Sequence, residues 1–378
     1  MKVADDLLVS VIVPARNEEA CLALCLETLV SQSGIAFELI VVDDASTDRT
    51  GEIARSFMES PGMDAGGYTV ICAPPLPENW TGKNNAMSAG AKIAKAKWLL
   101  FTDADTFHKP GSLARAVAEA EQHGAALLSY SPEQEVHGFW ERAVMPVIFA
   151  ELAATYPPKT VNDPASRIAA ANGQYLMISR EAYDAVGGHA AISSNLLEDV
   201  AMARMVKSSG RKIFFRYGGD AVRTRMYRSW AQMKEGWTKN LALLFPKPAE
   251  LAWKRLWQFI IFVSLPPSLL RGAYWEPFLD HSRPGLLRWQ SLFLGIVVGV
   301  YFVFWLVAYV ARMRKSHSGW LAIGLGIFGL PVFAYLLWRS DRACKNARFD
   351  WKDRTYVYTP EEGKALSAAH PASGGNES

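Results

Sequence analysis

Two groups of aspartates each directly follow a short apolar stretch of the chain. The first group consists of Asp43, Asp44 and Asp48, and the second of Asp103 and Asp105. Like charges this close together repel each other unless a cation or hydrogen-bond donors lie nearby. An Asp-x-Asp pair on a turn can direct its oxygens at one Mg²⁺ or Mn²⁺ ion, which takes phosphate oxygens as further ligands. An isolated Asp-x-Asp is usually a solvated turn, but its position after an apolar strand favours a metal site.

These aspartates belong to a regular alternation of strand patterns and helix patterns. Strands are predicted at residues 8–14, 37–43, 68–72, 98–102 and 125–130, and helices at 18–32, 47–58, 84–96 and 111–123. The alternation predicts an α/β fold with a doubly wound, mostly parallel sheet. Ligands of such sheets bind beyond the carboxyl ends of the strands. The two aspartate groups follow the second and fourth strands, so we expect both at that edge.

Five segments together resemble the family 2 glycosyltransferases, in the order and at the spacing usual for that family. They are Val13-Pro14-Ala15-Arg16-Asn17-Glu18-Glu19, Val42 to Asp48, Gly82-Lys83-Asn84, Asp103-Ala104-Asp105 and Glu198-Asp199. The resemblance covers about residues 8–219. It implies a GT-A fold that binds a nucleotide-diphosphate sugar, with a UDP-sugar as the expected donor.

The resemblance also implies a role for each matching residue. Pro14, Arg16, Glu18 and Asp44 would contact the base and ribose, Lys83 the ribose or diphosphate, Asp103 the ribose and diphosphate, Asp105 the metal, and Gly173 the donor sugar, while Asp199 would be the catalytic base. Taken alone, these residues also allow two purely structural interpretations. Lys83 would be a surface lysine, and Glu198-Asp199 an acid pair favoured by the dipole of a helix N-terminus.

The residue types suit this chemistry. A departing sugar diphosphate gains negative charge, which a divalent metal ion neutralises as a Lewis acid. An acceptor hydroxyl is a poor nucleophile, so a carboxylate such as Asp199 would remove its proton during attack. One base without a second carboxylate nucleophile predicts a single displacement with inversion.

Three segments beyond the catalytic part are similar to the bacterial carotenoid-acid glycosyltransferases of the diaponeurosporenoate type. These segments are Thr224 to Tyr227, Glu235 to Asn240 and Trp351 to Tyr356. The catalytic part is also similar to the hopanoid-associated glycosyltransferases, and both groups act on pathways of polyisoprenoid membrane lipids. The Gln-x-x-Arg-Trp motif of processive polysaccharide synthases is missing, because Glu235-Gly236 precedes Trp237. The sequence therefore predicts a single transfer to an isoprenoid or carotenoid-like acceptor.

Two other functions were weighed against this prediction. Transfer to a polyprenyl phosphate or another glycolipid is the close alternative, because an ionised phosphate attacks without a base. A catalytically silent membrane scaffold would have lost its metal or base residues, whereas Asp105 and Asp199 are both present.

A net charge of +3 is too small to indicate a nucleic-acid partner. Cys21 and Cys25 lie four residues apart and are expected to be buried thiols.

The second half of the chain predicts attachment to a membrane. Residues 221–255 are basic and rich in Trp, as in interfacial segments on anionic lipid. Residues 289–310 and 320–338 each have about the 20 apolar residues needed to span a bilayer. Residues 256–270, interrupted by Pro266-Pro267, would be interfacial or re-entrant, although a third span is the alternative. Residues 139–154 could form either a buried helix or an interfacial one.

The distribution of basic residues predicts the orientation. The tail, residues 339–378, carries six Lys or Arg residues between Arg339 and Arg354, and basic segments stay on the cytoplasmic side. Two spans place this tail on the same side as the catalytic domain, residues 1–220. We therefore expect a protein of the inner or plasma membrane with a cytoplasmic catalytic domain and tail.

Overall fold

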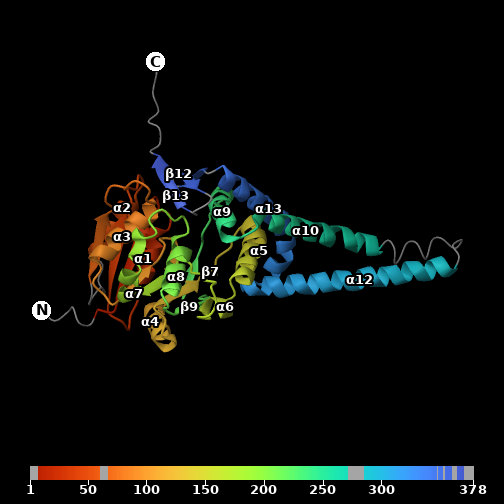
Figure 1. Ribbon diagram of the computed structural model, residues 1–378, viewed down its shortest axis with the longest axis horizontal. Helices are drawn as coiled ribbons and strands as arrows, with labels where there is room; N and C mark the ends of the chain where they lie inside the picture. Colours follow the sequence, from red (N-terminus) through yellow and green to blue (C-terminus); the bar gives the residue numbers. More distant parts are fainter. Residues whose placement is uncertain are drawn as a thin grey trace, which may run out of the picture. The chain divides into compact units, whose positions relative to one another are not determined.

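The computed structural model describes residues 7–59, 67–270, 285–346, 348–351, 354–359 and 364–369 (Figure 1). Parts of the predicted membrane region, residues 271–284, and of the predicted tail, residues 347, 352–353, 360–363 and 370–378, lie outside the described residues. The chain forms two compact units. The first contains residues 1–135, 156–243 and 343–378, and the second contains residues 136–155 and 244–342.

A seven-stranded sheet forms the centre of the first unit. Its strands, in spatial order, are β3 (Tyr68–Cys72), β2 (Phe37–Asp43), β1 (Val9–Ala15), β4 (Trp98–Phe101), β8 (Leu176–Ser179), β6 (Leu127–Ser131) and β9 (Ile213–Tyr217). All neighbouring pairs are parallel except the two that involve β8. The predicted α/β fold with a mostly parallel sheet is confirmed. Strands β8 and β9 were not predicted.

Helices cover both faces of this sheet. One face packs against α1 (Leu22–Val30), α2 (Thr50–Ser56) and α4 (Ser112–His123), and the other against α3 (Gly82–Ile93), α6 (Pro158–Asn162), α7 (Arg180–Ala185) and α8 (Glu198–Ser208). Along β1, Val11 and Val13 belong to the first core and Ile12 to the second. A strand buried on both faces favours apolar side chains on both, which explains the β-branched stretch Val11-Ile12-Val13.

Two predicted helices begin three or four residues later than expected. The helix expected from residue 18 begins at Leu22, and the one expected from residue 47 begins at Thr50. The residues before each helix form hydrogen bonds between the two loops instead. For example, the N–H of Glu18 donates to Thr50 Oγ1 at 2.7 Å. Asp48 Oδ1 accepts from the Thr50 N–H at 3.0 Å and so still satisfies a donor at the start of α2.

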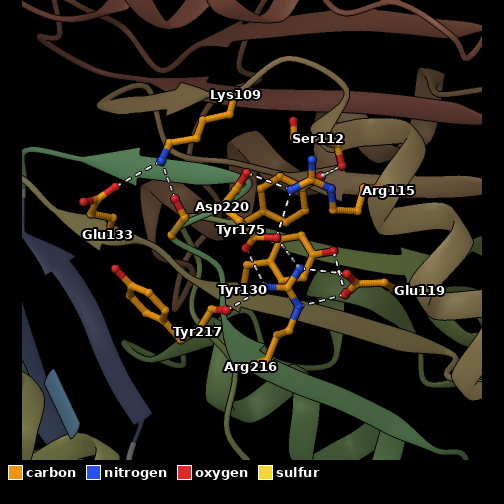
Figure 2. Close-up of polar contacts among 11 residues, drawn as sticks. Lys109, Ser112, Arg115, Glu119, Tyr130, Glu133, Tyr175, Arg216, Tyr217 and Asp220 are labelled. Atoms are coloured by element: carbon orange, nitrogen blue, oxygen red, sulfur yellow. Dashed lines mark hydrogen bonds and ion pairs between the residues drawn. The ribbon is translucent and has the colours of Figure 1, made fainter. Parts of the chain in front are cut away.

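A second, three-stranded sheet lies beside the carboxyl end of the main one, with the order β5 (Thr106–His108), β10 (Val222–Thr224) and β7 (Glu133–Gln134). The turn that leads from β9 into β10 is fixed by Arg216 (Figure 2). Arg216 donates to both oxygens of Glu119 on α4 at 2.8 Å and to Asp220 at 2.6 Å, and it covers the ring of Tyr130. Hydrogen bonds from Arg216 lower the pKa of Glu119, although burial alone would raise it. This clamp holds β10 in place against β5.

The chain continues into the second unit through α9 (Trp230–Leu244), which lies almost entirely in the first. The second unit contains α5 (Phe139–Thr155), α10 (Pro248–Leu270), α12 (Gly285–Met313) and α13 (Trp320–Lys345), while β11 (Arg348–Trp351), β12 (Arg354–Thr359) and β13 (Lys364–Ala369) form an antiparallel sheet of the first unit. Short 3₁₀ helices occur at Phe57–Glu59, Gly188–Ala190 and Arg314–Ser316. Helix α5 buries most of its central residues, from Ala143 to Glu151, as a buried helix would.

Two helices of the described residues are long and apolar enough to cross a membrane. They cover Phe293–Ser316 and Trp320–Lys345, with mean hydropathy of 2.4 and 2.0. Both overlap the two predicted spans. The expected break in α10 at Pro266-Pro267 is wrong, because the helix continues to Leu270. Proline removes a helical N–H donor, but the preceding turns are supported by packing of Phe262 on Tyr309 of α12.

Candidate active site

The loops that follow β1 and β2 interlock at the carboxyl edge of the main sheet. Arg16 donates from Nη1 to the backbone oxygens of Asp44 at 2.7 Å and Ala45 at 3.2 Å. Asn17 and Ala45 both have positive φ angles, 53° and 55°, and Asn17 Oδ1 accepts from the N–H of Thr47 at 2.9 Å. These contacts bring the predicted nucleotide-contacting residues of the two loops together.

The remaining residues of this group follow the same edge. Pro14 lies in β1 beside Val42 of β2, and Asp44 directly follows β2 with its side chain buried. Glu18 Oε2 accepts from the thiol of Cys21 at 3.2 Å. Burial and, secondly, the charge of Glu18 raise the pKa of the Cys21 thiol, so Cys21 stays protonated. The expectation that Cys21 and Cys25 are buried thiols is confirmed.

Lys83 joins the loop after β4 to the start of α8. Its Nζ lies 2.7 Å from Asp103 Oδ1 and 2.7 Å from Glu198 Oε1. Burial alone would lower the pKa of Lys83, but the two carboxylates raise it well above its usual value. The same lysine outweighs burial at Glu198 and lowers the pKa of that carboxyl group. Lys83 is therefore a charged bridge between two segments, with a side chain that is 35% exposed.

Gly173 contacts this bridge from the segment before β8. Because β8 is antiparallel to β4, the start of β8 lies at the carboxyl edge of the sheet. The N–H of Gly173 donates to Asp199 Oδ2 at 2.8 Å. A Cβ atom at Gly173 would lie 3.2 Å from both Glu198 Oε1 and Lys83 Nζ. Only a residue without a side chain fits here without shifting the ion pair.

Asp199 is half-buried at the start of α8 and has a different partner set from Glu198. Its Oδ1 accepts from the N–H of Val200 at 2.7 Å, while Oδ2 accepts from Gly173. Burial, and secondly the negative charge of Glu198, raise the pKa of Asp199 to about 7, against the opposing effect of Lys83. Neighbouring carboxyl groups with pKa values pushed apart are typical of acid–base sites. One member is fixed as an ion-pair partner and the other can exchange a proton near neutral pH.

Asp105 directly precedes β5, and its backbone oxygen accepts from Thr224 Oγ1 of β10 at 3.1 Å. Its carboxylate adds to the main effect of burial in raising the pKa of Cys25 and of Tyr227. Within the described residues, no group of three or more His, Cys, Asp or Glu side chains surrounds a common point. A closed protein cage for a metal is thus not formed there. The donor set fits Mg²⁺ or Mn²⁺ held by one or two carboxylates and completed by phosphate oxygens.

Two further features of the site could not be found from spacing. Gln174 donates to Thr224 Oγ1 at 3.1 Å and its backbone oxygen accepts from Thr102 Oγ1 at 2.8 Å, so it links β4 to β10. Lys239 of α9 lies within electrostatic range of Glu198, Lys83, Asp103 and Asp199. Burial is the main cause that lowers the pKa of Lys239 to about 8. Lys239 belongs to the Glu235 to Asn240 motif, but no pattern in the sequence connects it with the acidic residues.

Comparisons with known proteins show what the chain is similar to. Residues 10–187 match the family model of glycosyl transferase family 2. This match covers 178 of the 378 residues, so the sheet-forming part of the chain is similar to the family 2 glycosyltransferases. The 4,4'-diaponeurosporenoate glycosyltransferase of Staphylococcus aureus strain USA300 is 28% identical over 241 residues, 62% of this chain and 60% of that protein. For strain MRSA252 the identity is 28% over 295 residues, 75% of each chain.

The match to the first of these relatives spans only about 60% of its length. Among solved structures, a mannosyltransferase from Pyrobaculum calidifontis in complex with GDP-Man and Mn²⁺ is 15% identical, with a TM-score of 0.47 over 89% of this chain and 86% of that one.

Proposed function

We propose that this protein is an inverting glycosyltransferase that moves one sugar from a nucleotide-diphosphate sugar to a lipophilic acceptor. The observation that carries the proposal is the bridge formed by Lys83 between Asp103 and Glu198 at 2.7 Å each. It couples the Asp-x-Asp loop to the helix that begins with Glu198-Asp199. The residues proposed to bind the donor and the residue proposed to activate the acceptor would then lie at one edge of the sheet.

The donor would lie along the interlocked loops at this edge. Pro14, Arg16, Glu18 and Asp44 would contact the base and ribose, and the gathering of their loops through the Arg16–Asp44 hydrogen bond supports this. Lys83 and Asp103 would contact the ribose and diphosphate, and Gly173 the sugar. A UDP-sugar is the proposed donor.

The metal would be held by Asp105, with Mg²⁺ or Mn²⁺ completing its shell from the diphosphate. When bound, such an ion neutralises the negative charge that develops on the departing nucleotide. The protein contributes the position of Asp105, because the hydrogen bond from Thr224 to its backbone fixes the start of β5. Lys83, which stays charged, adds a fixed positive charge in the same region.

Asp199 would act as the base. Its pKa of about 7 gives it a strong affinity for a proton while it remains largely ionised at slightly alkaline pH. The hydrogen bonds from Gly173 and Val200 fix the carboxylate so that it can meet an acceptor hydroxyl. A single base of this kind supports one displacement, with inversion at the anomeric carbon.

The acceptor would be an isoprenoid or carotenoid-like lipid. Support comes from the relatives named for 4,4'-diaponeurosporenoate and from the two apolar helices long enough to cross a membrane. We propose a catalytic domain of residues 1–220 and a basic interfacial segment of residues 221–255, followed by membrane residues 256–338 and a cytoplasmic tail of residues 339–378. The protein would lie in the inner or plasma membrane with its catalytic domain in the cytoplasm.

The acceptor class can be tested by product analysis. The full-length protein, purified in detergent, is incubated with labelled UDP-sugars and a lipid extract of its host, and the labelled lipids are separated by charge. The proposal expects a neutral glycolipid in which a glycosidic bond joins the sugar to an acceptor hydroxyl. Labelled sugar on a polyprenyl phosphate would instead support the alternative, in which the acceptor is already ionised and no base is needed.

A further inference from the structure

The second unit contains a groove that the proposed transfer reaction does not use. It lies between α10 and α12 and has a volume of about 590 Å³, within the range of roughly 300–1,000 Å³ typical of ligand pockets. Three of its lining residues are tryptophans, Trp253 and Trp257 from α10 and Trp305 from α12. Trp253 and Trp257 are more than half exposed. Tryptophans with this much exposed surface are typical of the interface between a membrane and water.

A buried cluster of charges lies at one end of this groove. Glu151 of α5 accepts at a single oxygen, Oε1, from Arg255 at 2.8 Å and from Arg312 at 2.8 Å. The side chains of Glu151 and Arg255 are only 4% and 9% exposed. Within the described residues, one carboxylate thus faces two guanidinium groups, which leaves one positive charge without an acidic partner in the cluster. The side chain of Arg312 is 40% exposed, so an anion from outside can reach its guanidinium group and complete the cluster.

Arg255 itself has an unsatisfied donor. Its Nη1 donates to Gln258 Oε1 at 2.7 Å and its Nη2 to Glu151, but its buried Nε has no hydrogen-bond partner among the described residues. Glu250, an acid in the groove lining, is paired with Lys247 at 2.8 Å. Lys254 adds a further cation to the lining. The charge at this end of the groove therefore favours a negatively charged ligand.

The two helices are antiparallel, so the charged end and the apolar part of the groove are separated along both of them. On α12, Arg312 lies seven residues, or roughly 10 Å, beyond Trp305 on the same face. On α10, Arg255 is followed by the apolar residues Trp257 and Ile261. Arg312 also lies near the end of the apolar segment Phe293–Ser316. A ligand with an anionic head and an apolar chain matches a groove that is positively charged at one end and apolar along the rest.

We infer that this groove binds one anionic phospholipid, with its phosphate at Arg255 and Arg312 and an acyl chain along Trp257, Ile261 and Trp305. Guanidinium groups bind phosphate in a fixed, often bidentate geometry. The lipid supplies the negative charge that Glu151 alone does not, and it fastens α10, α12 and α5 together. This role is independent of the proposed transfer reaction, because none of these residues belongs to the candidate active site.

Native mass spectrometry of the full-length protein in detergent tests the inference. Phosphatidylglycerol and phosphatidylcholine with identical acyl chains are titrated separately. One phosphatidylglycerol is expected to bind per protein, at least about tenfold more tightly than phosphatidylcholine, as expected when a hydrogen-bonded charge pair is made. Inorganic phosphate at millimolar concentration should not displace it. Equal binding of the two lipids, or displacement by phosphate, would overturn the inference.

Matched variants localise the effect. Arg312→Gln keeps the Glu151–Arg255 pair and removes the surplus charge, so the preference for phosphatidylglycerol should fall about tenfold. Arg314→Gln makes the same charge change at a residue that stacks on Trp320 outside the groove, and it should leave the preference unchanged. An equal loss in both arginine variants would show only a general surface-charge effect and overturn the site.

A third variant covers the case in which Arg312→Gln fails to fold. Trp257→Ala changes an exposed side chain, which folding can tolerate, and removes part of the wall along the acyl chain. It should weaken binding of long-chain phosphatidylglycerol while a dihexanoyl analogue, which does not reach that wall, binds as before. Unchanged binding of the long-chain lipid to Trp257→Ala would contradict the placement of the chain.

Discussion

The backbone N–H of Gly173 donates to Asp199 Oδ2 at 2.8 Å, across 26 residues of sequence. This contact ties the segment before β8 to the first turn of α8. Oδ2 of Asp199 thus accepts a backbone N–H, while the ammonium group of Lys83 pairs with Asp103 and Glu198. Two adjacent acids in the sequence thereby acquire opposite properties: Glu198 is fixed as a carboxylate, and Asp199 has a raised pKa.

The activity is expected to depend on pH through Asp199. Its pKa is raised to about 7, so the base form dominates only above that pH. The logarithm of kcat/KM should rise as pH increases from about 5.5 to 7 and level off above about 8. Since the folded-state pKa lies above the unfolded one, the stability linked to this group is full at acid pH and is lost as pH rises through 7. A flat pH–rate profile would indicate an acceptor that is already ionised.

Gly173→Ala should lower kcat with little change in fold. The added Cβ would lie 3.2 Å from Glu198 Oε1 and Lys83 Nζ, so the ion pair must shift by a few tenths of an ångström. A misplacement of this size beside the reacting groups is expected to cost on the order of tenfold in rate. Gly319→Ala, where a Cβ meets only open space, is the matched control. If Gly173→Ala kept wild-type kinetics, the close approach of Gly173 to the Lys83–Glu198 ion pair would not matter for catalysis.

The carboxyl edge of the sheet could be predicted from the sequence because it depends on local patterns. Asp103 and Asp105 follow an apolar strand, and this order alone assigns them to the edge where Lys83 was also expected. The central strands were indicated by short segments that are mostly apolar, as expected for strands that are buried on both faces. These features are encoded within a few neighbouring residues.

Other features depend on contacts between distant segments and could not be predicted. Strand β8 has only four residues, and its antiparallel direction follows from pairing with β4 and β6. Lys239 reaches the acidic cluster because α9 packs there, although it lies 40 positions from Asp199 in the sequence. The surplus charge near Glu151 arises from three separate helices. Tertiary contacts decide each of these arrangements.

Removal of the metal should weaken donor binding. Asp105→Ala, or an excess of chelator, is expected to reduce nucleotide-sugar affinity at least about tenfold, since even residues that only orient a metal ligand typically contribute about 10–100-fold. Calorimetric titration with a UDP-sugar, with and without Mn²⁺, measures this. Asp184→Ala removes an equal charge from the exposed surface of α7 and should bind normally. Full affinity and activity in chelator would rule out the metal.

The topology with two spans can be read from cysteine accessibility. Cys344 lies near the end of α13, after the second predicted span, whereas Cys21, Cys25 and Cys72 precede both predicted spans in the sequence. A membrane-impermeant thiol reagent applied to sealed spheroplasts should label none of the four. After permeabilisation the exposed Cys72 should react, which controls for reagent activity. Labelling of Cys344 from outside would require three spans.

The central claim is that Asp199 is the catalytic base, and the rate of sugar transfer by the Asp199→Asn variant tests it most directly. The amide keeps the size of the side chain and an acceptor oxygen for a backbone N–H, but it cannot take a proton at neutral pH. With a labelled UDP-sugar and the lipid acceptor at pH 8, kcat should fall by about 10²–10⁴, the usual contribution of a general base. Donor and metal affinity, measured by titration, should stay near those of the wild type. Near-normal turnover in this variant would contradict the assignment of Asp199 as the base.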